Sequence, residues 1–202
     1  MSDKALFDAV RAILGRGLTQ PEVEQINRAL GRTIASAVVT GMKASPRATA
    51  IIHEFESFRA EAYPDPGSKN GLPVTCGYGS TRHLDGRPIR LGETWTREYA
   101  ARVFARDLAV FEQGVNALLQ GRPTTQNQFD ALVSLAYNIG LDIDDDAHAE
   151  GLGDSSLLKH HLAGDYARAK VAFRSWRFND GKEMRGLVRR REAEAELYGT
   201  PA

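Results

Sequence analysis

Residues 51–81 read IIHEFESFRAEAYPDPGSKNGLPVTCGYGST, and the rest of the chain is organised around this stretch. Its first half places apolar side chains at the spacing of one buried helical face: Ile51, Ile52, Phe55, Phe58 and Ala62. Pro64 and Pro66 cannot continue a helix, and a residue before proline leaves the α region. The pattern therefore predicts a helix that ends near Tyr63, with Asp65 in the turn beyond it.

A β-hairpin is expected after this turn, because Asn70-Gly71 is a strong hairpin-turn pair. Two alternating sets of residues follow, and they point to opposite faces of a strand: Val74, Cys76 and Tyr78 on one, and Thr75, Gly77 and Gly79 on the other. The first face is predicted to be packed, with Cys76 as a small apolar filler. The second carries one hydroxyl and then bare backbone, so a ligand can approach it closely.

Three polar groups are thereby expected to lie near one another: Glu56, Asp65 and Thr75. Two carboxyl groups in different environments suit cleavage of a glycosidic bond, since one must donate a proton to the leaving oxygen while the other stays ionised. Glu54 and Glu61 fall in the same stretch. Periodicity alone does not choose among the glutamates, most of which are merely solvated in helices of this kind.

The stretch resembles the active-site region of the phage-type lysozymes, glycoside hydrolase family 24. That family carries Glu, eight residues, Asp, a short loop, and Thr before Gly-x-Gly, a pattern that Glu56, Asp65 and Thr75 match. The resemblance covers about residues 48–199. Further blocks within it match the family in order: residues 128–140, 156–158, 163–166, 173, 176 and 186–194. Three features depart from the pattern and bear on substrate fit: the longer loop before Thr75, Ser57 for a frequent Gly, and Ser80 for a frequent His.

The resemblance implies an α+β, mostly helical, lysozyme-like fold with two lobes around a cleft and a small antiparallel β-hairpin lobe. It implies hydrolysis of the β-1,4 bond between N-acetylmuramic acid and N-acetylglucosamine in peptidoglycan, leading to lysis of a bacterial host. Glu56 would be the general acid, and Asp65 with Thr75 would hold the attacking water. Gly77 and Gly79 would line the sugar groove. Either Arg189 or Arg190 would pair with a carboxylate near the cleft.

The rest of the chain is organised around this stretch. We expect a helical appendage in residues 1–45 and a catalytic domain in residues 46–202, divided into a small β lobe (65–95), a connecting helix (96–121) and a helical lobe (122–202). The appendage packs as added core or, alternatively, forms a wall-targeting or membrane-disturbing module. Residues 87–92 are predicted to form the last strand of the small lobe, at its edge because of Pro88.

Ser45 before Pro46 is expected to cap the helix that carries Glu56, and further cap signals predict the helices of the larger lobe. Thr96 caps the connecting helix, and residues 125–128 form a capping box for a helix that is apolar nearly all round, hence central and buried. Tyr137 and Asn138 at its end either reach substrate or serve as a packed Tyr and a helix-ending Asn. Further helices are expected at 155–162, 165–176 and 186–198.

The balance of charged residues does not point to one class of partner. The 26 basic and 26 acidic residues give no global argument for a nucleic-acid or membrane partner. Nine basic residues fall between Arg168 and Arg191. They are either solvated side chains on the surface or a basic region that is attracted to an anionic cell wall. No histidine pattern predicts a metal, the acidic residues 142–154 lack the spacing of a calcium loop, and we expect no cofactor.

The first residues lack the pattern of a signal peptide, and residues 33–42 are too short an apolar run to span a bilayer. We therefore expect the chain to accumulate in the host cytoplasm without a signal peptide. It would reach the periplasmic wall through a separate, holin-type membrane-permeabilising protein. We also expect the chain to be a monomer. Two rival functions stay open: a lytic transglycosylase, which needs the Glu but no Asp–Thr water site, and a non-catalytic peptidoglycan-binding protein.

Overall fold

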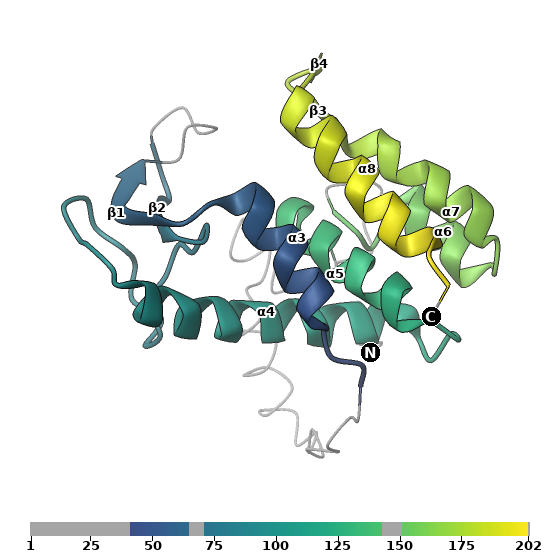
Figure 1. Ribbon diagram of the computed structural model, residues 1–202, viewed down its shortest axis with the longest axis horizontal. Coiled ribbons are helices and arrows are strands. Elements are labelled where there is room, and N and C mark those ends of the chain that lie inside the picture. Colours follow the sequence, from purple (N-terminus) through teal and green to yellow (C-terminus); the bar gives the residue numbers. More distant parts are fainter. Residues whose placement is uncertain (1–40, 65–70, 143–150, 202) are drawn as a thin grey trace, which may run out of the picture. The chain divides into compact units, whose positions relative to one another are not determined.

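The computed structural model describes residues 41–64, 71–142 and 151–201. From Gly41 onward the chain forms one compact unit. The first 40 residues of the appendage expected in residues 1–45 lie outside the described residues, as do Asp65, Asn70 and most of the acidic loop. Figure 1 shows a small β1–β2 sheet on one side, a group of helices on the other, and the long helix α4 running between them.

The helix that carries Glu56 is shorter than its sequence pattern predicts. Helix α3 (Pro46–Glu56) begins at the Ser45 cap, as expected, with Pro46 in its first turn. It ends at Ser57, whose φ of 44° lies in the left-handed region. The predicted helix to Tyr63 is wrong, because residues 59–64 are strand β1 (Arg59–Pro64). Glu61 consequently lies on a strand.

Strand β1 pairs antiparallel with β2 (Val74–Gly77), with Arg59 opposite Gly77 and Pro64 opposite Val74. Its other edge is bonded to the chain that follows, since the amide of Ala62 donates to the carbonyl of Glu93 at 2.9 Å. These bonds satisfy backbone groups that a longer α3 would have satisfied internally. Pairing with distant segments thus overrides the helical spacing of the apolar side chains.

The small lobe differs from expectation in two further respects. Residues 87–92 form no named strand; the structure has only isolated bridges there, such as Arg82 with Pro88, because turns at Gly86 and Gly92 (φ 84° and 88°) interrupt the pairing. The prediction of an open face on β2 is also wrong, since all four residues of the strand are buried. Val74 and Cys76 pack as predicted, in one apolar cluster with Ile89, Trp95, Ala100 and Val103.

The helical lobe agrees with the cap signals. Helix α4 (Arg97–Leu119) begins at Thr96, whose hydroxyl accepts from the amide of Tyr99, and α5 (Gln126–Ile139) begins with the predicted Thr125–Gln128 capping box. Ten residues of α5 are buried, which makes it the centre of the main core. The remaining elements are α6 (Ser156–Leu162), α7 (Tyr166–Ala172), the 3-10 helix η1 (Phe173–Trp176), β3 (Phe178–Asn179), β4 (Lys182–Glu183) and α8 (Arg185–Gly199).

Residues 41–45 attach to this core. The amides of Ala44 and Ser45 donate to the carboxylates of Glu112 and Asp130, at 2.8 and 2.9 Å. The entry to α3 is therefore held by two buried acidic side chains, one from α4 and one from α5. No helix among the described residues is long and apolar enough to cross a membrane.

Candidate active site

Glu56 ends α3 at the junction of the two lobes. Its side chain is 22 % exposed, and Arg190 from α8 donates through Nη1 to Oε1 at 2.6 Å. The other oxygen, Oε2, lies against Gly79, where an added Cβ would come within 3.2 Å of it. One carboxylate oxygen is thus fixed by a cation and the other faces a glycine with no side chain.

A buried ionic network holds Arg190 in place. Its Nε donates to Glu194 Oε1 at 3.1 Å and its Nη2 to the carbonyl of Ser134 at 3.2 Å. Ser134 Oγ donates to the same Glu194 oxygen at 2.7 Å, and Arg191 pairs with the other oxygen at 2.7 Å. Burial raises the pKa of Glu194, while the guanidiniums of Arg191 and Arg190 act in the opposite direction. The guanidinium that contacts Glu56 therefore has little freedom to move.

The neighbouring glutamate has a different environment. Glu54 is 58 % exposed and faces Arg189, itself 71 % exposed, across 3.5 Å. Exposed pairs of this kind contribute little to stability. The sequence left open whether Arg189 or Arg190 pairs with the carboxylate of the site. Both arginines face a glutamate, but Arg189 faces the exposed Glu54 at the surface, whereas the buried Arg190 contacts Glu56.

A tight turn places Gly79 beside the carboxylate. Cys76 and Ser80 exchange two backbone hydrogen bonds, of 2.9 and 3.1 Å, and Gly77 and Gly79 within the turn have φ of 68° and 85°. A residue with a side chain adopts such angles only at a cost in free energy. The turn therefore needs glycine at both positions, and at Gly79 the missing side chain also leaves room for Glu56.

Two helices hold this turn in place by hydrogen bonds. Tyr137 of α5 donates its hydroxyl to the carbonyl of Tyr78 at 3.0 Å, and Ser80 donates its hydroxyl to Asp107 of α4 at 2.8 Å. Burial, and then the charges of Asp107 and Glu56, raise the pKa of Tyr137, so its hydroxyl stays a donor. Asp107 also accepts from the Nε of Arg106 at 2.9 Å. The Ser80 that departs from the family pattern thus keeps a carboxylate partner.

A hollow of about 310 Å³ opens beside this turn. It is lined by residues of the turn and of the two helices: Gly79, Ser80, Thr81, Arg82, Arg106, Asp107, Val110, Phe111 and Tyr137. The structure brings Gly79 and Tyr137, two of the residues expected to bind substrate, to this hollow. Asn138, the next residue of α5, is exposed.

Thr75 and Gly77 do not line this hollow. Thr75 is 8 % exposed, and its hydroxyl donates to the carbonyl of Pro73 at 3.4 Å. Gly77 faces Trp95 and Ala100, so its lack of a side chain serves packing within the small lobe. Asp65 lies outside the described residues.

Sequence reasoning missed four residues of the site: Ser134, Glu194, Ser80 as a donor, and Asp107. Glu194 had a signal, because it stands four residues after Arg190 and three after Arg191, the spacings at which helical side chains meet. Asp107 had none, since its partner is 27 residues away in the sequence. Within the described ranges, no group of three or more His, Cys, Asp or Glu side chains could hold a metal ion.

Known proteins share this arrangement of elements. The family model for phage lysozyme matches residues 53–194. The endolysin of Acyrthosiphon pisum secondary endosymbiont phage 1 is 32% identical over 161 residues, which cover 78% of this chain and 98% of that protein. The endolysin of Bacillus phage B103 is 36% identical over 74% of this chain, but the match covers only 51% of that longer protein. The chain thus spans about half the length of some relatives.

Solved structures give the same result. The endolysin from Escherichia coli O157:H7 phage FAHEc1 superposes with a TM-score of 0.65 at 36% identity, covering 78% of this chain and 94% of that one. A mutant form of P22 lysozyme superposes with a TM-score of 0.63 at 28% identity, covering 79% of this chain and 99% of that one. These matches confirm the lysozyme-like, mostly helical fold with a small two-stranded sheet. By sequence and by structure, the chain belongs to the phage lysozyme family.

Proposed function

We propose that this chain hydrolyses the β-1,4 bond between N-acetylmuramic acid and N-acetylglucosamine in peptidoglycan. The observation that supports this most directly is the environment of Glu56, one oxygen of which is held by a buried arginine while the other faces Gly79 at the edge of a hollow. A carboxyl group whose two oxygens are so different can present one of them, in a fixed direction, to a leaving group.

In this mechanism Glu56 is the general acid. Oε1 accepts from Arg190, and Oε2 takes no side-chain hydrogen bond from the described residues, so a proton on the carboxyl group resides on Oε2. The glycosidic oxygen would then lie beside Gly79, and the hollow lined by Tyr137 would receive the adjoining sugar. Gly77 would support this region from within the small lobe, and Asn138 would contact the glycan from the exposed end of α5.

Asp65 and Thr75 would hold the attacking water. Thr75 lies on β2, the strand that leads into the Gly77–Gly79 turn, and in the sequence Asp65 comes directly after Pro64, the last residue of β1. A hydroxyl cannot act as an acid or a base near neutral pH, but it fixes a water by hydrogen bonding. The water would attack from the face opposite Glu56, and the reaction would invert the anomeric configuration.

The decisive experiment is a turbidity assay on permeabilised bacterial cells. We expect Glu56→Gln to abolish clearing, because it removes the proton donor while conserving shape. The matched control, Glu54→Gln, changes an exposed glutamate of the same helix and should clear cells like the unmodified chain. Equal loss from both variants would refute the assignment of Glu56, and no clearing by the unmodified chain would favour a non-catalytic wall-binding protein.

A lytic transglycosylase is separated by its product. That reaction closes a 1,6-anhydro ring on the muramic acid and consumes no water, whereas hydrolysis leaves a reducing end. We expect mass spectrometry of the released fragments to show the hydrated products. Anhydro sugars as the main product would overturn the water-holding role of Asp65 and Thr75.

We further propose that the chain depends on a separate holin-type protein to reach the wall, and that it acts as a monomer. Expression of this chain alone in intact cells should not lyse them, while addition of a membrane-permeabilising agent should cause prompt lysis. Lysis without the agent, with the protein recovered from the periplasm, would contradict this dependence and indicate export of the chain itself.

A further inference from the structure

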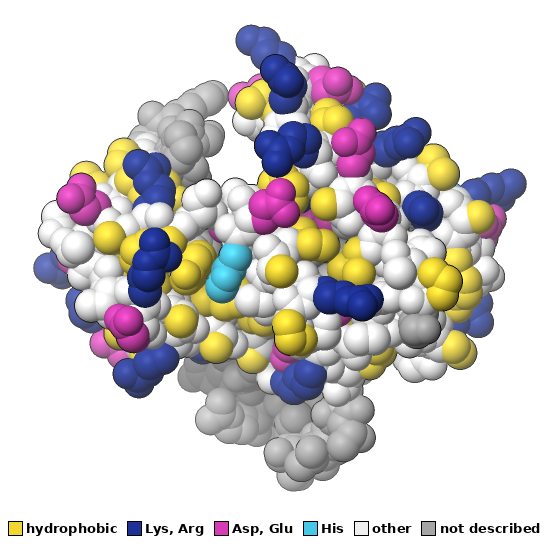
Figure 2. Space-filling view, viewed as in Figure 1, with side chains coloured by type: hydrophobic (Ala, Val, Ile, Leu, Met, Phe, Trp, Pro, Cys, Tyr) yellow, Lys and Arg dark blue, Asp and Glu magenta, His cyan; other side chains and the backbone are white. Residues whose placement is uncertain are grey.

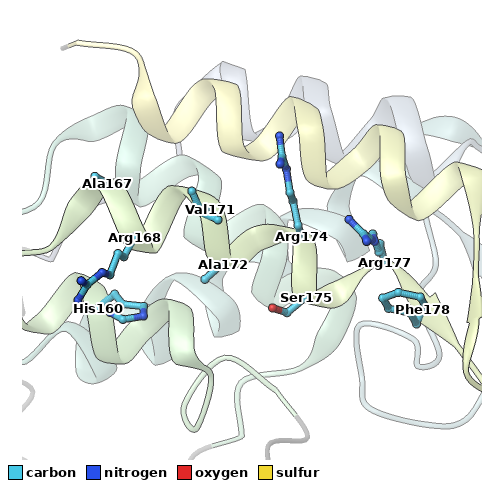
Figure 3. A pocket seen from close by; sticks show the side chains of 9 residues that line it. All are labelled: His160, Ala167, Arg168, Val171, Ala172, Arg174, Ser175, Arg177 and Phe178. Atoms are coloured by element: carbon cyan, nitrogen blue, oxygen red, sulfur yellow. The ribbon is translucent and has the colours of Figure 1, made fainter.

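A second hollow, of about 630 Å³, lies along α7, η1 and the start of β3, and we call it the α7 groove. Its lining residues are His160, Ala167, Arg168, Val171, Ala172, Arg174, Ser175, Arg177 and Phe178. None of these belongs to the Glu56 site. Figure 3 shows His160 and Arg168 at one end, Arg177 and Phe178 at the other, and Arg174 between them.

We propose that the α7 groove binds the acidic peptides of the cell wall, at a site separate from the one that cleaves the glycan. This inference rests on the proposed function, because it concerns the same polymeric substrate. It assigns to the groove a ligand class, short peptides that carry free carboxylates and small apolar side chains.

The charge of the groove favours an anion. Three of the nine lining residues are arginines, and none is acidic. Arg168 and Arg177 have acidic neighbours beyond the lining, Asp165 at 3.4 Å and Glu183 at 2.7 Å. These pairs lie near the surface and are easily exchanged for a ligand carboxylate. Arg174 is exposed and has no ion pair within the described ranges.

The basic segment between Arg168 and Arg191 therefore has two distinct functions. Arg190 and Arg191 are buried in the network behind Glu56 and cannot contact a partner. The arginines of the α7 groove remain accessible, and Figure 2 shows further Lys and Arg side chains gathered over the β3–β4 hairpin and the start of α8. The predicted attraction to an anionic wall is thus confined to the outer residues of the segment.

Apolar exposure makes a peptide a better occupant than a phosphate polymer. Val171 is 62% exposed and Phe178 is 50% exposed, and both line the α7 groove beside arginines. A polyphosphate chain has no apolar groups to cover them. A peptide that alternates carboxylates with alanine-like side chains can cover apolar residues and pair with arginines together.

The spacing of the arginines suits an extended peptide. Arg168 and Arg174 are separated by roughly 9 Å of helical rise, and Arg174 and Arg177 by about 6 Å at 3-10 rise. Side chains on one face of an extended chain recur every 6–7 Å or so. Carboxylates two residues apart in an extended peptide can therefore reach Arg174 and Arg177.

A second binding site has a physical use for an enzyme whose substrate is an insoluble network. When the groove holds a peptide, cleavage sites on nearby glycan are presented at a high effective concentration, without any new contact at Glu56. The expected effect is a lower KM on peptide-bearing wall, with kcat unchanged.

Binding can be measured with the catalytically inactive full-length Glu56→Gln chain. Trp176 lies between two lining residues and is partly exposed, whereas Trp95, the other tryptophan of the chain, is buried in the small lobe. Titration with the free tetrapeptide released from peptidoglycan should change tryptophan emission saturably. Arg174→Glu should weaken this binding at least fivefold. Arg102→Glu, the same change at an exposed position of α4, should leave it unaltered.

Three results would overturn the proposal: no saturable response to the tetrapeptide, equal weakening by Arg174→Glu and Arg102→Glu, or binding of poly(glycerol phosphate) where the tetrapeptide does not bind.

Kinetic measurements then test whether the groove helps the enzyme act on intact wall. Arg174→Glu should raise KM several-fold on intact wall and leave the rate on amidase-stripped glycan unchanged. If the unmodified chain cleaves neither substrate, the proposed function fails, while the binding result stands independently.

Discussion

Arg190 Nη1 and Glu56 Oε1 are 2.6 Å apart, although the two residues are 134 positions apart in the sequence. The contact joins the last helix of the chain to the last residue of α3. It places a fixed positive charge at one oxygen of the carboxyl group and leaves the other facing Gly79. The orientation of the proposed acid thus depends on α8, although no residue of this helix lines the hollow beside Gly79.

Replacement of Arg190 by glutamine should unfold the site as well as inactivate it. The change leaves Glu194, which is fully buried, with one cation fewer, and removal of one partner from a buried pair costs about 3–5 kcal/mol. We expect a loss of this size in the free energy of unfolding, measured by urea denaturation, together with loss of clearing activity. Arg189→Gln, at an exposed pair, should cost less than about 1 kcal/mol. If Arg190→Gln leaves the free energy of unfolding unchanged, the network does not stabilise the fold.

Gly79→Ala tests the approach to Glu56. The added Cβ would lie 3.2 Å from Oε2, at a φ of 85° that disfavours any side chain. Gly86→Ala provides a matched control, because Gly86 has a φ of 84° and nothing within 4 Å of an added Cβ. Both variants should lose about 1 kcal/mol of stability through backbone strain. Only Gly79→Ala should lower kcat markedly, and comparable rates for the two variants would contradict the role given to Oε2.

Thr75→Ala tests the water-holding pair. We expect most of the activity to be lost, because the water loses a hydrogen-bond partner, while Thr75→Ser, which keeps the hydroxyl, should retain it. Initial products from the unmodified chain should have inverted configuration, read by proton NMR before mutarotation. Inverting enzymes place their carboxyl groups roughly 6.5–9.5 Å apart to admit this water. A predominantly retained β-product would rule out the role assigned to Asp65 and Thr75.

His161 should make stability fall in mild acid. Its ring nitrogens contact the hydroxyls of Tyr198 at 2.6 Å and Thr124 at 2.9 Å, and burial, then the charge of Arg122, lower its pKa to about 4. Between pH 6.5 and 4 the unfolded chain therefore binds the proton and the folded chain does not. The stabilising contribution is complete above pH 6.5 and is lost as pH falls toward 4.

Urea denaturation at several pH values measures this effect. His161→Gln should give a flatter dependence of the unfolding free energy on pH across that window. The control is His160→Gln on the same helix, at a partly exposed position, which should leave the slope as it is. An identical slope for His161→Gln and the unmodified chain would mean that other groups cause the acid sensitivity.

Elements with local signals could be predicted from the amino-acid sequence alone. The Ser45, Thr96 and Thr125 caps begin α3, α4 and α5 at the expected residues, because a cap joins atoms only two or three residues apart. The same holds for burial of α5, which follows from apolar side chains on all its faces. The family pattern also singled out Glu56 before its surroundings were known.

Features that depend on partners far away in the sequence could not be predicted and became visible in the folded chain. Residues 59–64 carry helical spacing, yet they form a strand because residues 74–77 and 93–95 supply backbone partners on both edges. Arg189 and Arg190 are adjacent in the sequence and both face glutamates. Burial alone, set by the packing of α8 against α5, makes Arg190 the partner of Glu56 and leaves Arg189 on the surface. Hydrogen bonds and ion pairs formed across 20 to 130 residues leave no mark in local periodicity, so the site could be named from the sequence but not assembled from it.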